Sequence, residues 1–139
     1  MPISKQQARD IAEAYLQLSH ALGRYRFDNF ATLKPAVRQR IEDAEWDLLG
    51  ASGTITTKAV GIALHDMQDD LKAIADGTAR ARKAIETIQT VKDVMEVTAA
   101  AVVLGGAIVA QNPGAIASAA ADLFSISKKA IEKHKKKES

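Results

Sequence analysis

Apolar residues recur every three or four positions near the start of the chain, which is the spacing of one face of an α-helix. Ser4 and Gln7 form the pattern of a capping box, and Ile3 can pack over the first turn. The apolar positions that follow are Ala8, Ile11, Tyr15, Leu18, Leu22 and Tyr25. Since these positions form one continuous stripe, we expect a helix that packs against other helices in a bundle.

A second helix is expected after the polar segment 28–32, because Pro35 suits the first turn of a helix, where backbone N–H groups have no partner. Its apolar stripe is Val37, Ile41, Ala44 and Leu48. The glycines of segment 50–53 suit a left-handed helix cap and a loop. We therefore expect this helix to end near Leu49.

The clearest stripe follows the threonines of segment 54–57, which are good N-caps. It keeps its phase through Val60, Leu64, Met67, Leu71, Ile74, Thr78, Ala81, Ile85 and Ile88. After Ile88 the phase shifts, so one helix could continue to Ala110 with a single stutter. The alternative is a break at Gly77, with Thr78 capping the next helix. The sequence leaves both alternatives open.

No charged side chain occurs between Val97 and Ala121. Asn112 as an N-cap and Pro113 as a first helical residue predict a turn at 111–114, and so a hairpin of two apolar arms. Each arm is about 20 Å long at about 1.5 Å per residue, shorter than the roughly 30 Å hydrocarbon core of a bilayer. Small residues such as Gly105 let helices approach closely both in a soluble bundle and in lipid, so either environment fits the hairpin.

Composition supports a helical class for the chain. Aromatic residues make up 4% of its 139 residues, and it has 3 prolines and 8 glycines, too few for a protein of many short strands. The length suits one domain. We predict an all-α bundle of four or five amphipathic helices over residues 1–139, with a long central helix, an alanine- and glycine-rich C-terminal hairpin and a basic tail at 128–139.

The net charge of +2 conceals an asymmetry. Residues 125–139 contain six lysines and two glutamates, a net charge of +4, which leaves −2 for the rest of the chain. The lysines of the tail are Lys128, Lys129, Lys133, Lys135, Lys136 and Lys137. Such a tail is either a solvated helix end that complements the helix dipole or a surface that attracts anionic lipid or nucleic acid.

Chemistry-bearing motifs are scarce. The chain has no cysteine, and its three histidines are far apart, with His65 and Asp69 forming a surface pair on one helix face rather than a metal site. No phosphate-binding loop or nucleophile motif occurs. We therefore expect no catalytic residue, cofactor or metal, and no enzyme. Nucleic acid is a disfavoured partner, because no aromatic residue follows Phe124 to stack bases.

Aromatic residues offer two further sites. Trp46 lies among acidic residues, where it either closes the edge of the bundle or marks an interaction patch. Tyr25, Phe27 and Phe30 are expected to pack together and hold the first turn between helices.

The N-terminal sequence lacks the apolar core and cleavage site of a secretory signal. We expect a protein that is soluble when synthesised and is either cytoplasmic or exported by a route that needs no cleaved signal, with membrane association as a further option.

Segment 94–126, preceded by the long heptad stripe and followed by Lys128 and Lys129, resembles the apolar segment of helical pore-forming proteins such as haemolysin-E-like toxins and colicin pore domains. The resemblance implies a segment that is sheltered in the soluble bundle and exposed on insertion. It also implies lipid-facing side chains at Val102, Val103, Leu104, Ile108, Val109 and Ile116.

Two functions follow from these patterns. In the first, the hairpin is masked in a pore-former-like bundle and meets an anionic membrane surface, which the lysine tail holds. In the alternative, the protein is a soluble inhibitor, chaperone or scaffold whose helices bind a helical protein partner or a second copy. The residues assigned to the membrane or partner hairpin are Val102, Val103, Leu104, Gly105, Gly106, Ile108, Val109, Pro113, Gly114 and Ile116.

Overall fold

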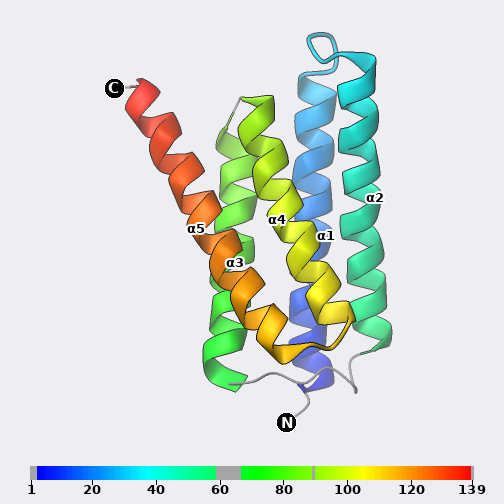
Figure 1. Ribbon diagram of the computed structural model, residues 1–139. Helices are drawn as coiled ribbons and strands as arrows, with labels where there is room; N and C mark the ends of the chain where they lie inside the picture. The colour runs from blue at the N-terminus through cyan, green and yellow to red at the C-terminus, as the bar shows by residue number, and fades with distance from the viewer. Residues whose placement is uncertain (1–2, 59–66, 89, 139) are drawn as a thin grey trace.

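The computed structural model describes residues 3–58, 67–88 and 90–138, and the side chains of Met67 and of 134–138 lie outside the description. It is an all-α bundle, as the sequence predicts. The described residues form five helices, which are α1 (Lys5–Asp28), α2 (Pro35–Thr57), α3 (Met67–Thr87), α4 (Val91–Val109) and α5 (Pro113–Glu138). Successive helices alternate in direction, so α1, α3 and α5 run one way (Figure 1). The helix α4 contacts α2, α3 and α5, while α5 packs on α3 and α4.

The start of α1 is the predicted capping box. The Gln7 backbone N–H donates to Ser4 Oγ at 3.0 Å, and the Ser4 N–H donates to Gln7 Oε1 at 2.7 Å. Ile3 is buried beside this turn, and so is every residue of the predicted α1 stripe. The predicted start of α2 at Pro35 is also confirmed.

The expected end of α2 near Leu49 is wrong, because the helix continues through 50–53 to Thr57. Two contacts hold its last turns against the bundle: the Ile55 side chain is fully buried, and Ser52 Oγ donates to the Ala12 carbonyl of α1 at 2.7 Å. These contacts outweigh the roughly 1 kcal/mol cost of each helical glycine. The Thr57 hydroxyl donates to the Gly53 carbonyl at 3.0 Å, so it serves the end of α2 and is no N-cap.

The break at Gly77, one of the two alternatives that the sequence leaves open, does not occur. Gly77 is buried within α3, and a Cβ built there would lie 3.1 Å from the Ala120 carbonyl oxygen of α5, so the glycine permits close helix packing. Thr78 donates its hydroxyl to the Ile74 carbonyl at 2.8 Å and is not a helix cap.

A single helix to Ala110 is also wrong, since α3 ends at Thr87 and α4 begins at Val91, next to the phase shift. Two positions of the predicted stripe, Val60 and Leu64, lie outside the described residues.

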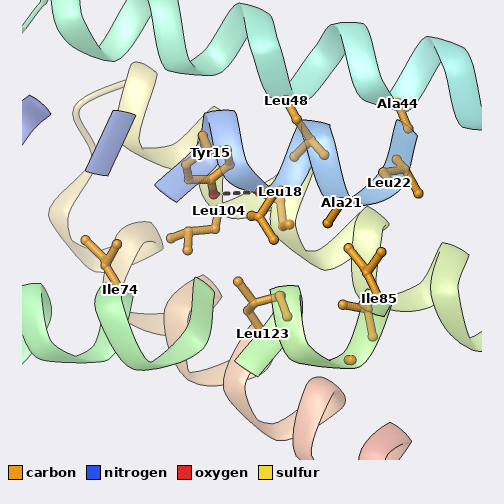
Figure 2. Packing of buried hydrophobic residues seen from close by; sticks show 14 of the residues in the cluster. Tyr15, Leu18, Ala21, Leu22, Ala44, Leu48, Ile74, Ile85, Leu104 and Leu123 are labelled. Carbon is orange, nitrogen blue, oxygen red and sulfur yellow. Dashed lines mark hydrogen bonds between the residues drawn. The ribbon is translucent and has the colours of Figure 1, made fainter. Parts of the chain in front are cut away.

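The core lies between the helices and receives side chains from all five. Figure 2 shows Leu18 and Leu22 of α1 among side chains from the other helices. These partners include Leu48, Ile74, Ile85, Leu104 and Leu123. Tyr15 is fully buried, and its hydroxyl donates to the Ala101 carbonyl of α4 at 2.7 Å (Figure 2). Burial raises the pKa of the Tyr15 phenol above its ordinary value.

Candidate functional site

The predicted hairpin is formed by α4, a three-residue turn and α5. Gln111 adopts a left-handed conformation with φ of 60°, and the Asn112 N–H donates to the Ala107 carbonyl at 3.3 Å, which closes a Schellman-type end to α4. Asn112 Oδ1 then accepts from the Ala115 N–H at 3.2 Å, and Pro113 begins α5. The predicted turn and its N-cap are therefore confirmed.

The structure divides the ten residues assigned to the hairpin into an inner and an outer group. Leu104, Ile108 and Ile116 are fully buried, and Gly105 is buried with them. The outer group is exposed and consists of Val103, Gly106 and Gly114. Half-buried positions between the two groups are Val102, Val109 and Pro113. The large apolar side chains of the hairpin thus belong mostly to the core of the bundle.

The two adjacent glycines of α4 have different surroundings. A Cβ built on Gly105 would lie 3.0 Å from Tyr15 Cε1 and 3.2 Å from Ala51 Cβ, so Gly105 lets α4 pack directly on α1 and α2. Among the residues that the structure describes, no atom of another part of the bundle lies within 4 Å of a Cβ built on Gly106. Together with the hydrogen bond from Tyr15 to Ala101, the contacts at Gly105 fix the hairpin to the first two helices.

The outer side of the hairpin is exposed and carries no charge. On α4 the exposed positions recur with helical spacing, and on α5 the face includes the exposed positions one helical turn before Ala119 and Asp122, which share a hollow with Ala99 and Val103. We call this surface the hairpin face. It consists of Ala99, Val103, Gly106, Ala110, Ala115 and Ser118. Val103 is 63% exposed, unusually high for a valine in a packed bundle.

A hollow of about 360 Å³ lies between α4 and α5 beside the hairpin face. Its apolar lining is formed by Ala99, Ala100, Val103, Ala119 and Ile126. Glu96 and Asp122 also line the hollow and are the first charged residues beyond the uncharged segment on either arm. The uncharged parts of both arms therefore end at the same level of the bundle.

Most lysines of the tail lie on the last turns of α5. Lys128 and Lys129 are exposed, whereas Lys133 Nζ lies 3.5 Å from Asp93 Oδ1 of α4. Lys133 thus has an ion-pair partner within the bundle. The side chains of Lys135, Lys136 and Lys137 lie outside the description.

The expected packing of the aromatic residues is partly wrong. Tyr25 is buried, but Phe27 is 79% exposed, and the Phe30 ring lies under the Arg38 guanidinium with a centroid distance of 3.9 Å. Trp46 is 65% exposed, so it does not close the edge of the bundle, and the interaction patch stays a prediction. Leu49, one turn further along α2, is also exposed, which the sequence did not reveal.

Two further features bear on the candidate chemistry. Among the residues that the structure describes, no group of three or more His, Asp or Glu side chains could hold a metal ion. His20 is exposed, and His65 lies outside the described residues. No helix within the described ranges is both long enough and apolar enough to cross a bilayer.

Comparison of the chain with protein families, with curated proteins and with solved structures finds no match.

Proposed function

We propose that this protein is a helical interaction protein that binds a protein partner through the hairpin face. The observation that carries the proposal is the exposed, uncharged stripe on α4, centred on Val103. The solvent side of a helix in a bundle normally carries charged and polar side chains. An exposed face without them is typical of a surface that another molecule covers.

The hairpin face suits a helix as its partner. Its side chains are small, so the backbone of a partner helix can approach α4 and α5 closely, and larger partner side chains can enter the hollow beside Val103. Glu96 and Asp122 flank this hollow and favour a partner with basic residues at the corresponding end. Apolar contact would thus supply affinity, and charge would set the orientation.

A protein partner fits this surface better than lipid does. Burial of apolar groups contributes about 0.8 kcal/mol per CH₂, and the hairpin face offers mainly alanine and glycine. The larger side chains of Leu104 and Ile108 become available to lipid only if α4 leaves α1 and α2, which breaks the hydrogen bond from Tyr15 to Ala101.

Membrane binding by a released hairpin is the second candidate function. The uncharged parts of α4 and α5 end at the same level of the bundle, and Lys128 and Lys129 lie beyond this level on α5. Both features support this function. A hairpin inserted tip first would place these lysines toward the anionic head groups.

Photo-crosslinking in the cells that make the protein separates the two candidates. A photoreactive phenylalanine analogue replaces Val103, and the control variant carries it at Arg40, an exposed position of α2. We expect a discrete protein adduct, with a partner or a second copy, from position 103 and not from position 40. The substitution Ser118→Glu, which adds charge to the same face, should abolish the adduct. Adducts with lipid alone would favour the membrane function, and no adduct at position 103 would contradict both.

A further inference from the structure

A second apolar surface lies between α1 and α3, away from the hairpin face. These helices run in the same direction (Figure 1) and enclose a groove of about 460 Å³ along the N-terminal half of α1 and the middle of α3. Ile11 and Ile74 are buried at its floor. The remaining apolar lining comes from Ala14, Leu71, Ala75 and Ala79. The groove exists because alanine side chains do not fill the space between the two helices.

The length of the groove suits a short helix packed along it. On α1 its lining extends from Gln7 to Gln17, about 15 Å or three helical turns at about 1.5 Å per residue. Toward the C-terminal ends of the two helices, Arg24 of α1 pairs with Glu86 of α3 at 3.6 Å. The open length is therefore limited to the N-terminal half of α1 and the middle of α3.

The rim of the groove on α1 is acidic. Asp10 and Glu13 line it, and the hydrogen bonds to their carboxylates come from the neutral side chains of Gln6, at 2.9 Å, and Gln17, at 2.8 Å. Within the described part of the chain, neither carboxylate takes part in an ion pair with a basic side chain at 4.0 Å or less. On the α3 rim, Arg82 lies 2.9 Å from Glu86, a carboxylate that it shares with Arg24, so Asp10 and Glu13 outnumber the one basic residue of the lining. The groove thus has a local negative charge in a chain of net charge +2.

We propose that this groove binds an amphipathic helix of a partner protein, with apolar side chains on the groove floor and Lys or Arg side chains beside Asp10 and Glu13. A helix satisfies its own backbone hydrogen bonds, whereas an extended peptide would need backbone partners that two α-helices do not offer. This site lies on helices other than those of the hairpin face. The two proposals are therefore independent, and the failure of one leaves the other unchanged.

Two 14-residue peptides with the same helical pattern of leucine test the site, one with lysine and one with glutamate at every polar position. Fluorescence anisotropy of labelled peptide measures binding to the full chain. We expect the lysine peptide to bind at least tenfold more tightly than the glutamate peptide. Replacing both Asp10→Asn and Glu13→Gln should remove most of this preference. Equal binding of the two peptides, or no binding of either, would overturn the proposal.

A groove-filling variant with a matched control localises the binding. Ala75 is exposed at the groove and Ala36 is exposed on α2, so Ala75→Phe and Ala36→Phe make the same change at two surface positions. Ala75→Phe should weaken the lysine peptide at least tenfold, while Ala36→Phe leaves its affinity unchanged, with circular dichroism melts confirming that both variants fold. Unchanged affinity of Ala75→Phe would overturn the proposal. So would a peptide-free wild-type chain that sediments as a dimer and becomes monomeric on Ala75→Phe, because the occupant would then be a second copy.

Discussion

Replacing Gly105 and, separately, Gly106 by alanine makes the same chemical change at adjacent positions of α4. Each substitution gains about 1 kcal/mol of helix propensity. At Gly106 the new methyl group meets nothing within 4 Å, so Gly106→Ala should stabilise the protein by about that amount. At Gly105 the methyl group would lie 3.0 Å from the Tyr15 ring and 3.2 Å from Ala51 Cβ, closer than normal contact. Overpacking of this kind costs about 1–3 kcal/mol.

Since the gain in helix propensity is common to both variants, the difference between their free energies of unfolding measures the packing of α4 on α1 and α2. We expect Gly105→Ala to be less stable than Gly106→Ala by about 1–3 kcal/mol. Urea unfolding followed by circular dichroism at constant m-value gives this difference directly. If both variants gain the same stability, Gly105 does not lie against Tyr15 and Ala51, and the account of how the hairpin is held is refuted.

Three further predictions concern the same part of the molecule. Tyr15→Phe removes the buried hydrogen bond to the Ala101 carbonyl and should cost about 0.5–1.5 kcal/mol in urea unfolding, whereas unchanged stability would mean that this bond contributes nothing. Burial raises the pKa of the Tyr15 phenol, so the folded state keeps its proton where the unfolded chain loses it. The contribution of Tyr15 to the free energy of unfolding should therefore be constant below about pH 10 and fall above it. In Tyr15→Phe the loss of stability above about pH 10 should be smaller, because only Tyr25, whose pKa burial also raises, then contributes to it. The same dependence of stability on pH in Tyr15→Phe and wild type would contradict the role of Tyr15. Gln111→Gly relieves a left-handed conformation and should raise stability by up to about 1 kcal/mol, as a higher midpoint in a thermal melt; a lower midpoint would argue against that conformation.

Much of the fold could be predicted from local signals. The capping box at Ser4, the start at Pro35 and the turn before Pro113 are set by nearby residues, and each lies where the sequence places it. The α1 stripe is likewise buried as a unit, because its helical spacing brings all of its residues to one side.

The glycines show where local signals fail. Gly50, Gly53 and Gly77 suggest helix ends, yet all three lie inside helices, since a cost of about 1 kcal/mol per glycine is smaller than the tertiary contacts of Ile55 or the close packing of α3 on α5. The actual division between α3 and α4 has neither glycine nor proline near it. Its signal in the sequence is the change of phase after Ile88.

The sequence shows where along the chain the candidate site lies, but it does not show which side of the helix faces solvent. The absence of charge marks Val97–Ala121 as unusual, yet adjacent apolar residues such as Val103 and Leu104 give no sign of which one faces solvent. That choice depends on the side of α4 that meets Tyr15 and Ala51, which are 50 or more residues away in the chain. The groove between α1 and α3 also depends on tertiary contact, because its two walls come from separate stripes.

Thiol labelling of single-cysteine variants tests the central claim most directly, because the chain has no cysteine of its own. In the purified protein, Val103→Cys should react as fast as the control Arg40→Cys on α2, while Ile108→Cys, a core position, stays protected. In the cells that make the protein, Val103→Cys should become protected and Arg40→Cys should remain reactive, because the bound partner covers the hairpin face and not Arg40 of α2. Rapid labelling of Val103→Cys both in the purified protein and in cells would contradict the account.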